Sequence, residues 1–283
     1  MDEVGLGKQL KAVRRKAGLT QQELCHKAGL SYSTLAKIER GAIKAPSIFT
    51  IQSIAAVLGS TLDELMGDLA PRLPVDANKK RSKSGVRFIY FDINGCLVRF
   101  FHRAFTRLAE ETGKPSDLIE TTFWHYNDAV CRGEMPMEDF NQRFAERLGL
   151  PSLDWLEYYM HAVDPIPEMH ELVYWAVQHY KVGLLSNIMP GFIEEMLKRK
   201  LLPNVPYTAI IDSSKTGAIK PEVQIYEAAQ YYTNCVPEEV LLVDDSRANI
   251  MAAERFGWHV LWFDDYRPDE SVARVREALE PEA

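Results

Sequence analysis

The chain has 283 residues, of which 46% are hydrophobic and 26% are charged, and these values exclude fibrous and disordered proteins. Its length favours two domains over one. The net charge is −7, no apolar run reaches the roughly 18 residues of a membrane helix, and the first 18 residues carry acids and bases, so we expect a cytoplasmic protein with no membrane partner.

The charge is unevenly distributed along the chain. Residues 1–69 contain nine Lys/Arg and seven Asp/Glu, and residues 70–85 contain five and one. Residues 86–283 contain nineteen Lys/Arg and thirty-two Asp/Glu. A mildly basic front segment can approach a polyanion while an acidic body stays away from it, so the distribution favours a polyanion as the partner of the front segment.

Apolar residues at helical spacing predict five short helices in residues 1–69. The first ends at Gly18, and a capping box formed by Thr20 and Glu23 opens the second. The third runs from Ser31 to Arg40, with Ser31 as its cap. The remaining two are predicted at Ser47–Leu58 and Thr61–Met66.

Gly29 allows a tight turn between the second and third helices, which together form a helix-turn-helix. The third helix would bury Leu35 and Ile38 on its inner face. Its outward residues would be Tyr32, Ser33 and Lys37.

Residues 1–69 resemble the lambda-repressor/Cro-like (XRE-type) helix-turn-helix domains, in the stretches LTQQELCHKAGLSYSTLAKIERG and APSIFTIQSIAAVLGSTLDELMG. The resemblance implies that the third helix enters the major groove of double-stranded DNA, that Glu39 is structural, and that the protein is a homodimer on paired half-sites. The alternative is a helical bundle used only for dimerisation or protein contacts. The residues implied in DNA contact are Gln21 and Thr34 at phosphates and Ser31, Tyr32, Ser33 and Lys37 on the helix that would read bases.

Residues 70–85 contain Pro71, Pro74 and a basic run from Lys79 to Lys83, with little that is apolar. This composition is typical of a tether between domains, and its charge can add sequence-independent attraction to phosphates. The sequence therefore predicts a DNA-binding domain in residues 1–69, a linker in residues 70–85 and a second domain in residues 86–283.

The second domain begins with a predicted strand, Val86–Phe91, that runs directly into Asp92 and then Gly95. Such a strand presents a carboxylate at the carboxyl edge of a sheet, where open α/β sheets bind ligands. Helical spacing without a strand over residues 102–163 predicts an inserted helical cap, about residues 100–165. Strands and helices then alternate, which predicts a Rossmann-like parallel sheet and an α/β fold. The predicted strands are 182–186, 209–212, 240–245 and 260–263, and the predicted helices are 167–179, 190–200, 221–232, 246–256 and one from Pro268.

Four polar segments are expected at the carboxyl edge of this sheet. In order and chemistry they resemble the four motifs of haloacid dehalogenase (HAD)-like hydrolases, over about residues 86–265. The four segments are Asp92, Ser186–Asn187, Lys220 and Asp244–Asp245. The resemblance implies that Asp92 attacks phosphorus to form an aspartyl-phosphate. It also implies that Mg²⁺ is bound by Asp92, Asp245 and the backbone carbonyl of Asn94, with Asp244 supporting them.

The remaining motifs are implied to bind the phosphoryl group of a small phosphorylated metabolite. Ser186 and the amide of Asn187 would hold its oxygens, and Lys220, just ahead of Pro221 at the first turn of a helix, would neutralise charge. Phosphatases of this family usually carry a second aspartate as acid and base two residues after the nucleophile, where this chain has Asn94. An amide cannot exchange a proton at neutral pH, and losing this help costs about 10²–10⁴ in rate.

The LLSN, IKPEVQIYEAA and VDDSRANI segments are similar to the sugar-1-phosphate phosphatase-like branch, which lacks this acid yet hydrolyses esters. In the cap, Phe123–Asn127 with Arg132 and Glu134 mixes aromatic and polar groups as sugar pockets do, although a core role is favoured. We therefore expect a transcriptional regulator with a HAD-like domain that binds, and slowly hydrolyses, a phosphorylated metabolite. The alternatives are a catalytically inactive sensor or dimerisation module, and a phosphatase whose helix-turn-helix is accessory.

Overall fold

The computed structural model describes residues 4–43, 46, 48–60, 82, 84–99 and 101–280. It contains two compact units, Met1–Ala77 and Asn78–Ala283. The helix expected at Thr61–Met66 and most of the linker expected at residues 70–85 lie outside the described residues. Within the described ranges, no helix is long and apolar enough to cross a membrane.

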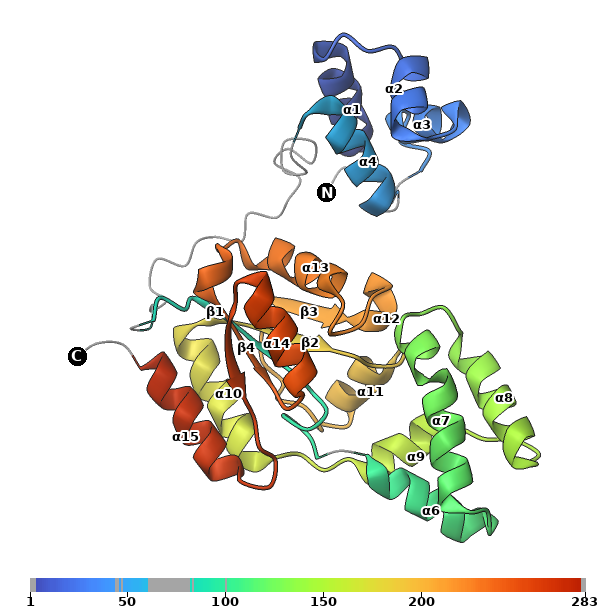
Figure 1. The fold of residues 1–283 in the computed structure, drawn as a ribbon, viewed down its shortest axis with the longest axis vertical. Helices are drawn as coiled ribbons and strands as arrows, with labels where there is room; N and C mark the ends of the chain where they lie inside the picture. Colours follow the sequence, from blue (N-terminus) through green and yellow to red (C-terminus); the bar gives the residue numbers. More distant parts are fainter. Residues whose placement is uncertain are drawn as a thin grey trace. The chain divides into compact units, whose positions relative to one another are not determined.

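The first unit contains α1 (Val4–Lys16), α2 (Gln21–Ala28), α3 (Tyr32–Glu39) and α4 (Ile48–Leu58) (Figure 1). The capping box at the start of α2 is confirmed, because the Thr20 side chain accepts from the Glu23 N–H and the Glu23 carboxylate accepts from the Thr20 N–H. Gly29 has a φ of 65° and allows the turn into α3. The predicted helix-turn-helix is therefore present.

A small apolar core and one buried ion pair hold these helices together. The core includes Leu24, Leu35 and Ile38, each 0–1% exposed. The Arg14 guanidinium on α1 lies 2.6 Å from the Glu39 carboxylate at the end of α3. Because both partners are buried, this pair fixes α1 against α3, as expected of a structural Glu39.

The second unit is built on a parallel sheet with the strand order β3-β2-β1-β4-β5. The strands are β1 (Phe88–Phe91), β2 (Lys181–Ser186), β3 (Ala209–Asp212), β4 (Val240–Asp244) and β5 (His259–Trp262). The side chains of β1 alternate between two cores, with Ile89 and Phe91 in one and Phe88 and Tyr90 in the other. A strand buried on both faces reads as a continuous apolar run, which explains why the sequence predicted it.

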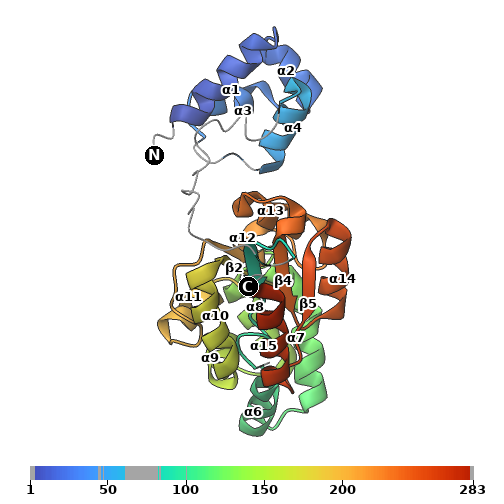
Figure 2. The same cartoon turned by 90° about the vertical axis from the view of Figure 1, so that its left-hand side faces the viewer.

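Helices cover both faces of this sheet, as Figure 2 shows. Helices α10 (Pro167–His179), α11 (Phe192–Lys198) and α15 (Pro268–Leu279) contribute to the core on one face. Helices α13 (Val223–Thr233) and α14 (Arg247–Phe256) contribute to the core on the other. Right-handed crossovers require this division, because the chain moves outward from β1 in both directions.

The insertion after β1 forms the helical cap, which consists of α6 (His102–Thr112), α7 (Ser116–Cys131), α8 (Met137–Leu148) and α9 (Trp155–Ala162) (Figure 1). Its α7 is anchored to the sheet domain, because the Arg132 guanidinium pairs with Glu222 at the start of α13. Gly133 lies so close to Ser214 that a Cβ atom on Gly133 would be 2.3 Å from the Ser214 carbonyl oxygen. The end of α7 is therefore seated directly on the sheet domain.

The structure differs from the sequence prediction in short segments and element ends. Strand β1 begins at Phe88 instead of Val86, and α13 begins at Val223 instead of Pro221, so Lys220 precedes the helix by three residues. The short helices α12 (Ser213–Thr216) and η2 (Pro237–Glu239) were not predicted, because a single turn shows no apolar periodicity.

Candidate active site

Asp92 follows β1 directly and remains part of the sheet edge, because its N–H donates to the Val243 carbonyl oxygen on β4 at 3.0 Å. The residue is only 6% exposed. Its Oδ1 accepts from the Ile93 N–H at 2.7 Å and from the Ser186 hydroxyl at 2.8 Å. These two donors orient the carboxylate and leave Oδ2 for other partners.

Lys220 supplies the cation of this site. Its Nζ lies 2.9 Å from Asp92 Oδ2 and 2.6 Å from Asp244 Oδ2, and its side chain is 1% exposed. Asn187 positions the lysine backbone on both sides, because Asn187 Oδ1 accepts from the Lys220 N–H and Asn187 Nδ2 donates to the Lys220 carbonyl oxygen. The ammonium group is therefore held between two carboxylates by the segment that follows β2.

Three carboxylates, those of Asp92, Asp244 and Asp245, form an acid cluster in which one oxygen of each lies within 4.8 Å of the others. Asp244 is fully buried and also accepts from the Ser246 N–H and the Asn249 side-chain amide. Asp245 reaches the cluster because the neighbouring Gly95 has no side chain. A Cβ on Gly95 would lie 2.1 Å from Asp245 Oδ2, and its φ of +80° also favours glycine.

The charges in the acid cluster are only partly balanced. Burial raises the pKa of Asp92, the Lys220 charge lowers it and Asp244 raises it, giving a value of about 6. Burial and the charges of Asp92 and Asp244 raise the pKa of Asp245 to about 7. Burial lowers the pKa of Lys220, but Asp244 and Asp92 outweigh burial and raise it. The acid cluster thus holds more negative charge than one ammonium group neutralises.

This donor set fits a hard divalent cation. Carboxylate oxygens are the ligands that Mg²⁺ prefers, and Mg²⁺ sites commonly use one or two carboxylates with other oxygen donors. The absence of a side chain at Gly95 lets the Asp245 carboxylate reach the acid cluster, and the raised pKa values of Asp92 and Asp245 indicate crowded negative charge that such an ion would offset. Asp92 and Asp245 could hold it, with Asp244 occupied by Lys220 and Asn249.

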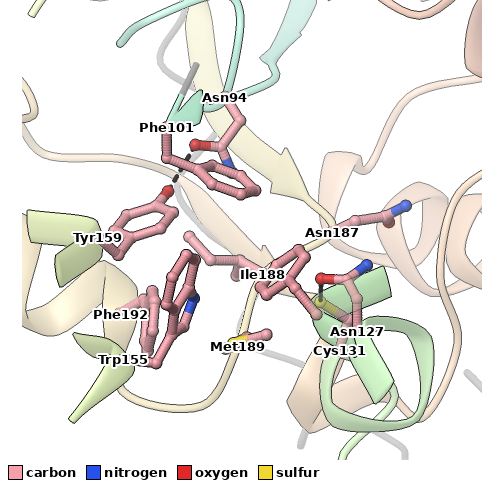
Figure 3. A pocket seen from close by; sticks show the side chains of 11 residues that line it. Asn94, Phe101, Asn127, Cys131, Trp155, Tyr159, Asn187, Ile188, Met189 and Phe192 are labelled. Atoms are coloured by element: carbon pink, nitrogen blue, oxygen red, sulfur yellow. Dashed lines mark hydrogen bonds between the residues drawn. The ribbon is translucent and has the colours of Figure 1, made fainter. Parts of the chain in front are cut away.

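Asn94, two residues after Asp92, is bound by the cap. The hydroxyl of Tyr159 on α9 donates to Asn94 Oδ1 (Figure 3). Tyr159 is 3% exposed, so this bond is buried at its donor end. The sequence analysis missed Tyr159, because no local pattern connects it to a residue 65 positions away.

A pocket opens between the cap and the sheet domain beside Asn94 (Figure 3). We call it the cap pocket. Of the cap residues named from the sequence, Phe123 and Asn127 line it, whereas Trp124 is 43% exposed and Arg132 instead pairs with Glu222. The lining residues are Asn94, Phe101, Phe123, Asn127, Cys131, Trp155, Tyr159, Asn187, Ile188, Met189 and Phe192.

The sequence-predicted residues of the second unit thus gather at one sheet edge. Ser186 differs in one respect, because its hydroxyl donates to Asp92 and not toward the open side where a phosphoryl oxygen would bind. Asn249 was not singled out, although it lies in the quoted VDDSRANI segment and hydrogen-bonds to Asp244. The signal for Asn249 was therefore present in the sequence.

The first unit presents a polar surface on α3. Tyr32 is 54% exposed, and Ser33 and Lys37 are also exposed. The Ser31 hydroxyl caps α3 by accepting from the Thr34 N–H and lies 2.8 Å from the Thr34 hydroxyl. Gln21 is engaged elsewhere, because its side-chain amide donates to Glu39 at 2.7 Å.

Comparison with known families agrees with both units. The model of the haloacid dehalogenase-like hydrolases matches residues 86–257, and the model of a helix-turn-helix family matches residues 10–65. The fold of the second unit, with its acid cluster and Lys220, is that of the haloacid dehalogenase-like hydrolases. The chain belongs to the haloacid dehalogenase-like hydrolase family and carries a helix-turn-helix domain in front of it.

One curated relative matches part of the chain. It is the immunity repressor protein of Bacillus phage phi105, 36% identical over 80 residues, which are 28% of this chain and 55% of the repressor. The chain therefore spans about half the length of that relative.

Solved structures share the fold of the second unit. A HAD family enzyme from Bacteroides thetaiotaomicron, a mutant crystallised with magnesium and inorganic phosphate, is 19% identical, with 63% of this chain and 94% of that chain covered and a TM-score of 0.55. A HAD-like family hydrolase from Porphyromonas gingivalis is 22% identical, with 68% and 98% covered and a TM-score of 0.52. At these identities the likeness concerns the fold alone.

Proposed function

We propose that the protein is a DNA-binding transcriptional regulator whose HAD-like domain binds a small phosphorylated metabolite with Mg²⁺ and transfers the phosphoryl group to Asp92. The observation that carries the proposal is the placement of Lys220 between Asp92 and Asp244 with Asp245 in the same cluster. A buried carboxylate with a purely structural role needs only one partner to balance its charge. A carboxylate that is paired with a cation and lies beside further acids is equipped to act on a phosphoryl group.

In this mechanism the Asp92 carboxylate attacks phosphorus and the leaving group departs on the opposite side. Ser186 and the Ile93 N–H hold Asp92 Oδ1, so Oδ2 is the attacking atom. Lys220 offsets the charge that the phosphoryl group brings to the acid cluster. Mg²⁺, when bound by Asp92, Asp245 and the Asn94 backbone carbonyl, supplies a Lewis acid that polarises the phosphoryl oxygens.

Breakdown of the aspartyl-phosphate is the slow step of this mechanism. Water must lose a proton as it attacks phosphorus, and the Asn94 amide cannot accept one. Its Oδ1 is moreover occupied by the Tyr159 hydroxyl. This arrangement favours slow turnover, which suits a domain that reports the presence of a metabolite.

The first unit, which we call the head, is proposed to read DNA with α3. Exposed Tyr32, Ser33 and Lys37 would reach base edges, while the buried pair of Arg14 and Glu39 keeps α3 in place. Two heads of this type bind two half-sites, so we propose a homodimer, located in the cytoplasm with the DNA.

The proposed phosphoryl transfer is tested by measuring phosphate release from a panel of phosphate esters in the presence of Mg²⁺. We expect slow release by the wild type and none by Asp92→Asn, because the amide is a poor nucleophile. Asp128→Asn, an exposed cap substitution, serves as the control and should retain the activity. Equal release by the wild type and Asp92→Asn would contradict the mechanism.

The proposed DNA binding is tested by selecting bound sites from random DNA at physiological salt. Lys37→Ala should reduce discrimination between selected and random DNA about tenfold, whereas Lys27→Ala, which removes the same charge from exposed α2, should lower affinity for both alike. Failure to enrich any site would favour an accessory head on a phosphatase.

A second candidate function is sensing without hydrolysis, and the engagement of Asn94 by Tyr159 favours it. In that case phosphate release stays at background, while a phosphate ester still raises the melting temperature and shifts DNA affinity. The two candidates therefore differ in product formation and agree in ligand binding.

A further inference from the structure

The cap pocket contains a buried hydrogen-bond donor with no partner. Trp155 is 0% exposed, and its Nε1 has no hydrogen-bond acceptor among the residues that the structure describes. Figure 3 shows the indole nitrogen turned toward the interior of the pocket, on the side facing Met189. A buried N–H without an acceptor costs about 1–3 kcal/mol, so this position is suited to an acceptor on a ligand.

Most other polar atoms that line the pocket are paired with protein atoms, and the amide nitrogen of Asn94, whose Oδ1 accepts from Tyr159, is left as a second donor. Both ends of the Asn187 amide bind the Lys220 backbone, and the Tyr159 hydroxyl binds Asn94. Asn127 donates to Asp128, and its Oδ1 accepts from the Cys131 thiol. The rest of the wall is largely apolar, including Phe101, Phe123 and Phe192.

This lining does not match a sugar. A sugar carries a hydroxyl group on most of its carbons, and each buried hydroxyl needs a partner that the wall does not offer. The cavity volume is about 20 Å³, room for about one water molecule. The pocket thus has room for a single acceptor oxygen at the end of a compact, mostly apolar group.

Asn94 imposes a second, independent restriction on the leaving group. Without an acid beside Asp92, a departing oxygen that is stable as an anion leaves faster than one that is not. A carboxylate is such a leaving group, whereas an alkoxide or a sugar oxygen leaves more slowly without a proton. Shape, hydrogen bonding and proton demand therefore favour the same chemical class.

We propose that the substrate is a small acyl phosphate, whose carbonyl oxygen enters the cap pocket and accepts a hydrogen bond from Trp155 Nε1–H. The proposal rests on the proposed function and names its substrate class. An Asp92 oxygen forms a bond to phosphorus, the bond between phosphorus and the acyl oxygen breaks, and its electron pair leaves with the carboxylate. Water then attacks phosphorus, the Asp92 oxygen recovers its electron pair, and phosphate and one proton are released.

The test uses the full chain with Mg²⁺ and compares three probes. Inorganic phosphate reports the acid cluster alone, acetonylphosphonate is a non-hydrolysable mimic of acetyl phosphate with a CH₂ group in place of the bridging oxygen, and glucose 1-phosphate represents sugars. Trp155→Phe keeps an aromatic ring but removes the N–H together with part of the indole. Trp124→Phe is the matched control, because Trp124 lies on the same cap but is exposed and outside the pocket lining.

We expect calorimetry to show that Trp155→Phe weakens acetonylphosphonate binding about tenfold and leaves phosphate binding unchanged, with no effect of Trp124→Phe. The melting temperature of unliganded Trp155→Phe should fall, because phenylalanine leaves a void among the buried aromatic rings, so the readout is the difference between the two ligands. Wild type should release phosphate from acetyl phosphate faster than from glucose 1-phosphate.

Equal binding of acetonylphosphonate by wild type and Trp155→Phe, or a preference for glucose 1-phosphate, would overturn this inference and leave the proposed function intact. A lower melting temperature of Trp155→Phe with unchanged discrimination would assign Trp155 a purely structural role. Absence of phosphate and acetonylphosphonate binding alike would overturn the proposed function of the second unit as well.

Discussion

The Tyr159 hydroxyl, on the last helix of the cap, donates a hydrogen bond to Oδ1 of Asn94, two residues beyond Asp92. The bond joins the cap to the loop that carries the proposed nucleophile. It also leaves the amide nitrogen, which can only donate, as the end of Asn94 that can turn toward a substrate. The Asn94 side chain can therefore donate a hydrogen bond to a substrate, but it cannot give up or take up a proton at neutral pH.

Replacing Asn94 by aspartate should convert the domain into a faster phosphatase. The new carboxyl group could protonate a leaving oxygen and then activate water, which is worth about 10²–10⁴ in rate. We expect hydrolysis of alkyl phosphates to rise by about 10² in Asn94→Asp, measured as phosphate release in Mg²⁺. Asn127→Asp places a carboxylate elsewhere in the cap pocket and should give no gain. An unchanged rate in Asn94→Asp would mean that the amide does not limit turnover.

Gly95 should be required for metal binding. Gly95→Ala would place a Cβ 2.1 Å from Asp245 Oδ2 and push that carboxylate out of the acid cluster. We expect Mg²⁺ affinity, measured by calorimetry, to fall at least about tenfold. Gly113→Ala is the matched control, because Gly113 has a similarly positive φ of +67° but nothing within 4 Å of the added atom. Equal loss in both variants would attribute the effect to backbone strain.

Lys220 should stabilise the fold by neutralising buried acids. Lys220→Met leaves Asp92 and Asp244 without their cation, which should lower the free energy of unfolding by about 3–5 kcal/mol at pH 8. Mg²⁺ should recover part of this loss. Lys215→Met removes an ion pair whose lysine is 61% exposed and should cost less than about 1 kcal/mol in the same denaturant titration. A comparable loss in both variants would argue against charge balance in the site.

The head should lose stability in acid through Glu39. Burial raises the pKa of Glu39, but hydrogen bonds from Arg14 and Gln21 and the Arg14 charge outweigh burial and lower it. A pKa lowered in the folded state gives stability that is complete above the unfolded value of 4.5 and is lost as the pH falls below it. We expect hydrogen exchange of α2 and α3 amides to accelerate below about pH 4.5.

Glu39→Gln tests the same pair by removing its charge. It should cost about 3 kcal/mol at pH 7 and flatten the pH dependence, because Arg14 then remains buried without a counter-charge. Glu23→Gln, in the exposed capping box, should cost less and keep the acid transition. An acid transition that persists in Glu39→Gln would assign it to other carboxylates.

Local patterns were sufficient to predict most of the fold. Strand β3 and helix α10 agree with the sequence prediction to the residue, and the other long elements agree to within about two residues at each end. The polar residues of the acid cluster were also found, since Asp92, Asp244 and Asp245 directly follow or end apolar strands. Such residues are readable because apolar periodicity and strand ends are properties of neighbouring residues.

Only the tertiary structure decided how these groups are connected. The contact of Tyr159 with Asn94, the turn of the Ser186 hydroxyl toward Asp92 and the unpartnered Trp155 in the cap pocket each depend on residues far apart in the chain. The direction of a side chain is set by the atoms that surround it, and those atoms come together only when the chain folds. The sequence by itself therefore determined which chemistry is available, and the packing determined which partners each group has.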